Sequence, residues 1–226
     1  MTEAAIPFDL YLITDPQTDV VAITRAALAA APRGRIGVQV RHKGATARDL
    51  VELARALIPV CRAQDAPLLV NDRIDVAREV GADGAHLPER GLDAILAREI
   101  LGADAIVGRS CHDRFGLARA AAEGASFATL GPLDAMHGKS PPIDAESFAS
   151  MVCESKVAVF ALGGVTPERV SGLRAAGARG VAVIRSIYAA PDPAGATRAL
   201  IAALDAAPGA VPLARALARA QARRVE

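Results

Sequence analysis

The sequence predicts one (β/α)8 barrel, also called a TIM barrel, and three observations lead to it. Eight short apolar runs alternate with longer amphipathic segments along the 226 residues, an order typical of parallel βαβ units. Eight such units in about 200 residues match the lower size limit of this barrel. No Gly-x-Gly-x-x-Gly turn follows the first apolar run, which disfavours the alternative fold, a doubly wound open sheet.

The elements follow from this alternation. We expect strands at residues 10–13, 36–40, 67–70, 84–87, 105–108, 127–130, 157–162 and 180–184. We expect helices after Pro16 to about Ala31, then at 47–63, 74–80, 93–101, 114–123, 144–152, 167–176 and 193–206. In the second helix, for example, Leu50, Ala54 and Leu57 recur at helical spacing.

The domain organisation predicted is one domain over residues 1–226, with the barrel at about 8–206. Pro208-Gly209 marks a joint. After it, residues 211–224 carry apolar side chains on one face and arginines on the other. This segment predicts an extra C-terminal helix that caps the barrel or contacts another subunit.

Composition excludes several function classes. Hydrophobic residues make up 52% and charged residues 23% of the chain, which supports a large core and excludes a disordered chain. The net charge of +1 gives no reason to expect a nucleic-acid or anionic-membrane partner. The first residues lack the basic and apolar pattern of a signal peptide, so we expect none, and no apolar run approaches about 20 residues. Three scattered cysteines, Cys61, Cys111 and Cys153, fit a reducing compartment. We therefore expect a soluble cytoplasmic protein with small-molecule ligands.

Candidate functional residues are those that follow each apolar run, because the active site of such a barrel lies at the C-terminal ends of its strands. Alternation places Gln39, Arg41 and Lys43 on one face at the end of the second strand. Two cations and an amide at a barrel mouth favour an anion such as phosphate or pyrophosphate. The alternative is a solvated or salt-bridged rim.

The third and fifth strands end in further polar residues. Asp72, after Asn71, is a candidate Mg²⁺ ligand, and the alternative role for this pair is capping the next helix. Ser110 is a candidate phosphate donor. His112, just before a helix, favours a structural role, and Cys111 beside it lacks the base spacing of a nucleophilic thiol.

The last three strands end in features that favour phosphate binding. Lys139 lies in the long irregular segment after the sixth strand, where it could close over an anion; the alternative is an exposed surface loop. The seventh strand ends in Gly163-Gly164 and the eighth runs into Arg185-Ser186. Loops after strands seven and eight are the recurrent phosphate site of this fold, where main-chain amides hold the anion.

Several motifs in this order resemble one superfamily. They are Tyr11-Leu12-Ile13-Thr14-Asp15, Val38-Gln39-Val40-Arg41-His42-Lys43, Asn71-Asp72-Arg73-Ile74-Asp75-Val76-Ala77, Ala82-Asp83-Gly84-Ala85-His86-Leu87, Gly131-Pro132, Lys139, Leu162-Gly163-Gly164-Val165-Thr166 and Gly180-Val181-Ala182-Val183-Ile184. From Leu10 to about Leu204 the chain resembles the thiamine phosphate synthase family and the related thiazole tautomerase family.

The resemblance implies a transferase of thiamine biosynthesis that joins aminopyrimidine methyl pyrophosphate to a thiazole phosphate. Pyrophosphate leaves first, and the thiazole nitrogen captures the resulting cation. By this resemblance the pyrimidine pyrophosphate contacts Gln39, Arg41, Lys43, Asn71, Ser110 and Lys139. Asp72 ligates Mg²⁺, and Gly164 with the main chain near Arg185 and Ser186 holds the thiazole phosphate. Barrels of this kind commonly pair, so a homodimer is expected.

The chain departs from the synthase pattern at several positions. Gly91 stands where the synthase has a second Mg²⁺ carboxylate; Glu89 and Asp93 are nearby carboxylates that could compensate, but neither matches the family pattern in register. Met136 and Gly138 replace two threonines of the phosphate loop, and His42 replaces a glutamate.

These departures leave two alternatives open. One is a thiazole phosphate tautomerase, although Pro132 stands where that family has its histidine; His137 is then the candidate proton shuttle. The other is a protein that binds thiamine phosphate without catalysis.

Overall fold

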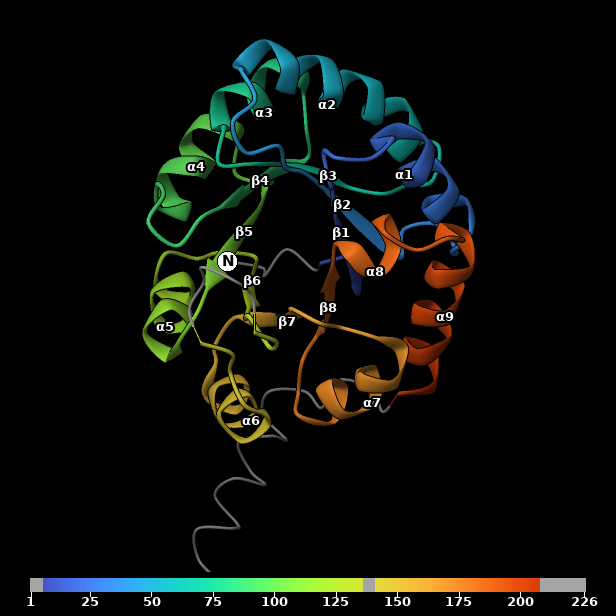
Figure 1. Cartoon of the computed structure of the whole chain (residues 1–226). Coiled ribbons are helices and arrows are strands. Elements are labelled where there is room, and N and C mark those ends of the chain that lie inside the picture. Colours follow the sequence, from blue (N-terminus) through green and yellow to red (C-terminus); the bar gives the residue numbers. More distant parts are fainter. Residues whose placement is uncertain (1–5, 136–140, 208–226) are drawn as a thin grey trace, which may run out of the picture.

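The computed structural model describes residues 6–135 and 141–207. Its eight parallel strands form a closed barrel in chain order (Figure 1), which confirms the predicted fold. The strands are β1 (Leu10–Ile13), β2 (Ile36–Val40), β3 (Leu68–Asn71), β4 (Gly84–Leu87), β5 (Ile106–Cys111), β6 (Phe127–Leu130), β7 (Ala158–Leu162) and β8 (Gly180–Val183). Pairing of Leu10 with Val181 joins β1 to β8 and closes the barrel.

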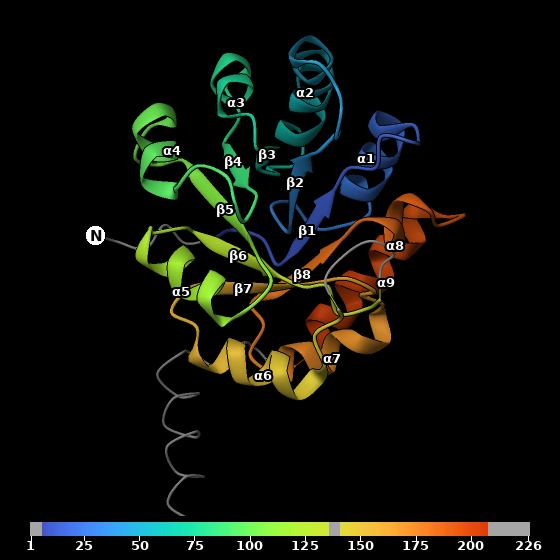
Figure 2. The same ribbon diagram turned by 60° about the vertical axis from the view of Figure 1, so that its left-hand side comes forward.

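Helices surround the barrel on its outside (Figures 1 and 2). They are α1 (Val20–Ala29), α2 (Ala47–Arg62), α3 (Ile74–Val80), α4 (Ala94–Leu101), α5 (Arg114–Ala122), α6 (Ala145–Glu154), α7 (Pro167–Ala175), α8 (Arg185–Tyr188) and α9 (Pro193–Ala206). Several start at an aspartate that caps the first turn, such as Asp19, Asp113 and Asp144. The additional helix predicted at 211–224 lies outside the described residues.

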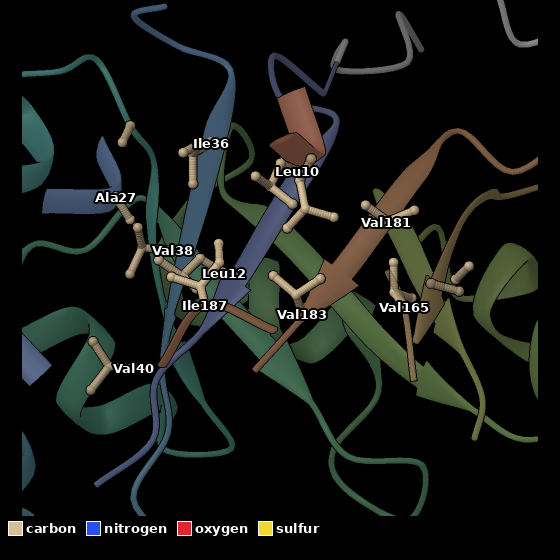
Figure 3. Packing of buried hydrophobic residues seen from close by; sticks show 14 of the residues in the cluster. Leu10, Leu12, Ala27, Ile36, Val38, Val40, Val165, Val181, Val183 and Ile187 are labelled. Carbon is tan, nitrogen blue, oxygen red and sulfur yellow. The ribbon is translucent and has the colours of Figure 1, made fainter. Parts of the chain in front are cut away.

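The main hydrophobic core lies between the strands and this ring of helices. Outward side chains of β1, β2 and β8, including Leu12, Val38 and Val183, pack against α1 and α8, with Ala27 and Ile187 among their neighbours (Figure 3). All five are at most 3% exposed. Small and β-branched residues fill this layer, as expected for close packing of helices on a parallel sheet.

A second core fills the barrel itself. Phe8, Tyr11, Phe127 and Phe160 are fully buried there, with ring centroids 5.0 to 6.3 Å apart. Gly108 makes room for these rings: a Cβ at this position would lie 2.6 Å from Phe127 and 2.4 Å from His86. These rings fill the interior of the barrel, so the open space lies beyond them, at the C-terminal ends of the strands.

Two local elements differ from the expectation. Strand β5 continues to Cys111 rather than ending at Gly108, so Ser110 faces the barrel interior while Arg109 points outward to Glu123. The short helix α8 occupies residues expected to form a loop. Within the described ranges, no helix has the length and apolar character needed to cross a membrane.

Candidate functional site

A cavity of about 740 Å³ opens at the C-terminal ends of the strands. Six residues chosen from the sequence line it together: Gln39, Arg41, Lys43, Asn71, Asp72 and Ser110. They come from the ends of β2, β3 and β5, which are separated in sequence but meet at one mouth. All three polar residues expected on one face of β2 border this cavity, but so does His42, because residues 41–43 follow the strand and are not bound by its alternation.

Residues at the end of β2 are held in place by β1. The buried amide of Gln39 donates to the Tyr11 hydroxyl at 3.1 Å. The Thr14 hydroxyl accepts from the main-chain N–H of Arg41 at 2.8 Å and donates to its carbonyl at 3.1 Å. Burial lowers the pKa of the half-buried Arg41 guanidinium, and the nearby Asp15 carboxylate opposes that shift. A partly desolvated cation such as this favours an anionic ligand.

His86, on β4, orients the hydroxyl of Ser110. Its Nε2 lies 3.0 Å from Ser110 Oγ and 3.5 Å from Thr129 Oγ1. Burial, with the charges of Arg41 and Arg109, lowers the pKa of His86 to about 3, so the ring is neutral at physiological pH. Nδ1 is buried and has no hydrogen-bond partner among the described residues. An orphaned N–H is costlier than an orphaned acceptor, so we infer that Nε2 carries the proton and donates to Ser110, whose own hydrogen is left to reach the cavity.

Asp72 has an unusual backbone. Its φ of 65° lies in the left-handed region, which non-glycine residues rarely adopt and which is frequent at functional sites. Its N–H donates to the His86 carbonyl at 2.9 Å. The capping alternative is not observed, because Arg73 is the N-cap of α3 and the described residues provide that helix with no side-chain cap. Asp72 instead borders the cavity, beside Asn71 and Arg73.

A metal site built by the protein alone would need a second carboxylate beside Asp72, and the sequence places Gly91, Asp93 and Glu89 at or near its expected position. Gly91 lies in a tight turn and donates to the Pro88 carbonyl at 2.9 Å. Asp93 caps α4 by accepting from the Leu96 N–H at 2.7 Å. Glu89 borders the cavity, yet its Oε1 lies 3.3 Å from where a Cβ on Gly116 would be, against the start of α5. Within the described residues, no group of three or more His, Cys, Asp or Glu is placed to hold a metal.

The predicted phosphate turn lies at the ends of β7 and β8. Gly164 has a φ of 58°, which suits glycine, and Arg185 is the exposed first residue of α8. The Ser186 hydroxyl donates to the Val165 carbonyl at 2.6 Å and so ties α8 to the loop after β7. Leu162 and Ile184, the neighbours of these residues, border the main cavity, so the turn lies beside it.

Two histidines near the cavity were not predicted as site residues, and one cysteine considered as a nucleophile does not suit that role. His86 belonged to a recognised motif, but period-2 alternation alone did not reveal its contact with Ser110. His112 also borders the cavity and its Nδ1 donates to the Gly131 carbonyl. Cys111 is buried and its pKa is raised to about 12 by burial, which excludes a reactive thiolate. Lys139 and His137 lie outside the described residues.

Comparison with known proteins gives consistent results. The pattern of a family described as thiamine monophosphate synthase matches residues 10–187. A putative thiamine-phosphate synthase of Geobacter sulfurreducens is 44% identical over 208 residues, which cover 89% of this chain and 96% of that one. The thiamine-phosphate synthase of Salinispora arenicola is 42% identical over 201 residues, 86% of this chain and 96% of the relative.

The same relationship is visible in three dimensions. The solved structure of a thiamine phosphate pyrophosphorylase from Pyrococcus furiosus superimposes with a TM-score of 0.78 at 28% identity. It covers 88% of this chain, and the match includes 96% of that structure.

Proposed function

The chain belongs to the thiamine monophosphate synthase family, and from this membership we propose how its barrel mouth carries out the family's reaction. Its activity is that of a transferase in thiamine biosynthesis, which joins aminopyrimidine methyl pyrophosphate to a thiazole phosphate and releases pyrophosphate. The observation that supports the proposed mechanism is the convergence of Gln39, Arg41, Lys43, Asn71, Asp72 and Ser110 on one cavity.

The pyrophosphate lies against the cations at the end of β2. Arg41 presents several N–H donors and Lys43 a single charge, which together balance an anion that gains charge as the C–O bond breaks. Asn71 adds a neutral donor on the neighbouring strand. These groups stabilise the leaving pyrophosphate more than the intact substrate, because its charge is largest after cleavage. Lys139, which lies outside the described residues, is a further cation that the family resemblance implies for this anion.

Ser110 completes this set with an oriented hydroxyl. Because His86 donates to its oxygen, the serine hydrogen is directed away from the ring and toward the anion. Gln39, fixed by Tyr11, holds the pyrimidine ring. Two substrates held in one orientation react as an effectively intramolecular pair, so positioning contributes much of the rate enhancement.

Asp72 is suited to be one ligand of a magnesium ion, since it borders the cavity. Mg²⁺ is usually held by one or two carboxylates together with substrate phosphates, and Asp72 provides one carboxylate at the cavity edge. When bound, the ion would neutralise part of the charge of the leaving pyrophosphate. Gly91, within its turn, provides no second carboxylate, so the substrate's own oxygens would have to supply the greater share of the ligands.

The thiazole phosphate lies at the turn of Gly164, with Arg185 and Ser186 beside it. Main-chain amides at such glycine turns hold phosphate. The thiazole nitrogen then faces the cation left by pyrophosphate. These are the chain's partners: two small phosphorylated substrates, with a homodimer as the further expectation that sedimentation would check.

The experiment mixes the purified full chain with both substrates and Mg²⁺ and follows thiamine phosphate by chromatography. We expect product, and we expect Asp72→Asn to lower its rate of formation at limiting Mg²⁺ while Asp104→Asn leaves it unchanged. Asp104 is the matched control because it is an exposed carboxylate before β5, at the opposite end of the barrel. No product above background, with an active control synthase, would refute the activity; equal rates for the two variants would refute the role of Asp72.

A further inference from the structure

The carboxylate of Asp134 lies on the turn proposed for the thiazole phosphate. A Cβ added to Gly164 would lie 1.6 Å from Oδ2 of Asp134, so the carboxylate occupies the space directly beside this glycine. Any larger residue at position 164 would clash with this carboxylate. An anionic group of the protein therefore already lies where an anionic group of the substrate is expected.

Arg169, on α7, joins this carboxylate to the turn. Its Nη1 donates to Oδ1 of Asp134 at 2.7 Å and to the main-chain carbonyl of Gly164 at 2.8 Å. The side chains of Arg169 and Asp134 are 39% and 52% exposed. Exposed ion pairs contribute little to stability, so a ligand can displace this carboxylate at small cost.

The main chain that carries Asp134 is anchored to β7. The N–H of Leu133 donates to the Leu162 carbonyl at 3.1 Å, and Leu133 is buried. The Ile143 N–H donates to the Pro132 carbonyl at 2.8 Å. These bonds hold residues 132 and 133 against the end of β7. The Asp134 side chain therefore starts next to Gly164 and contacts it without a shift of the main chain.

We propose that Arg169 is a binding residue for the phosphate of the thiazole substrate, and that Asp134 occupies its place in the free protein. The phosphate brings two negative charges and accepts from the guanidinium in place of the carboxylate, which turns outward to solvent. Repulsion between phosphate and carboxylate prevents both from lying at Gly164 together. Asp134 thereby weakens phosphate binding, and Arg169 strengthens it. This inference rests on the proposed phosphate site at Gly164.

The test measures binding of thiazole phosphate and of the unphosphorylated thiazole alcohol to the full chain by isothermal titration calorimetry. For Arg169→Met we expect about 10- to 100-fold weaker binding of the phosphate, the loss of one charge-assisted contact. For Asp134→Asn we expect about two- to fivefold tighter binding, the gain from removing a competing ion pair. Neither variant changes binding of the alcohol.

Arg55→Met is the matched control, since Arg55 forms an exposed ion pair with Glu79 on the barrel's outside and its loss should change neither affinity. The inference is overturned if Arg169→Met binds the phosphate as tightly as the unaltered chain, or if Asp134→Asn binds it more weakly. Product formation separates this result from the proposed function. If the unaltered chain makes thiamine phosphate and both variants bind thiazole phosphate as it does, the proposed function stands and this inference is wrong. If the unaltered chain makes no product but Arg169→Met weakens binding of thiazole phosphate, the inference stands and the proposed function is wrong.

Discussion

Replacing Arg109 by methionine tests whether the loop after β4 is held by a buried cation. Arg109 is 2% exposed and its Nη1 lies 2.8 Å from Oε2 of Glu123, whose side chain is 15% exposed. The same guanidinium donates to the carbonyls of Leu92 and Glu89. Methionine retains the length and apolar stem of this side chain but removes every one of these bonds.

The expected loss follows from what remains after the substitution. Breaking a buried ion pair by removing one partner costs about 3 to 5 kcal/mol, because a desolvated charge is left alone. Here Arg119 still donates to the Glu89 carbonyl and lies 3.8 Å from Oε1 of Glu123, and Glu123 keeps some contact with solvent. We therefore expect the lower end, about 3 kcal/mol, which for a chain of this size lowers Tm by roughly 6 to 12 °C.

Urea unfolding followed by circular dichroism measures this loss. The control is Arg55→Met: the Arg55–Glu79 pair has a similar 2.8 Å distance, but both side chains are 61% exposed, so about 1 kcal/mol or less is expected. If the two variants differ in the free energy of unfolding by less than about 1 kcal/mol, the argument from burial is wrong.

Three further predictions concern His86, Ser110 and two buried cysteines. The unfolded imidazole titrates near 6.5, whereas His86 in the folded chain has a pKa of about 3. Between pH 3 and pH 6.5, residue His86 is therefore protonated in the unfolded chain but not in the folded chain. Stability should be complete above pH 6.5 and fall by about 1.4 kcal/mol per pH unit below it; urea unfolding at pH 7 and 5 should show a flatter dependence for His86→Gln. Ser110→Ala should lower kcat by about 100-fold, as loss of one charge-stabilising donor does, in steady-state assays. Cys61 and Cys111, both buried with a pKa raised to about 12, should react with a thiol reagent only on unfolding, as stopped-flow absorbance would show.

Hydrophobic periodicity was sufficient to predict the barrel, because every strand is buried on both faces and every helix on one. It failed at β5 for a specific reason. Arg109 interrupts the apolar run, and a buried arginine is compatible with a strand only when a partner such as Glu123 balances it. That partner lies 14 residues later, beyond the reach of any local pattern. The four residues of α8 were missed because a single helical turn is too short to show a period.

Local sequence pattern also predicts the proposed pyrophosphate side of the site better than the proposed thiazole side. Gln39 and Ser110 lie within strands, and Arg41 and Asn71 lie at or just beyond strand ends; alternation alone directs such side chains toward the mouth. The side proposed for the thiazole phosphate is formed by loops, whose conformation depends on contacts between residues that are distant in the sequence. Gly164 was recognisable as a turn, but its neighbour Asp134 could be placed there only by the bonds that anchor the preceding residues to β7.

The two proposed phosphate sides should differ in how much they rearrange when a ligand binds. With Gly91 in a turn and Asp93 capping a helix, the proposed pyrophosphate side relies mainly on Arg41 and Lys43, which follow directly after β2, and Thr14 already fixes the main chain of Arg41. The side proposed for the thiazole phosphate instead carries the Asp134 carboxylate, which the ligand would have to displace. Binding at the first side therefore requires little rearrangement, whereas binding at the second exchanges one ion pair for another. Substitutions at strand residues should then affect the chemical step, and substitutions at Asp134 or Arg169 should mainly change the KM for the thiazole phosphate.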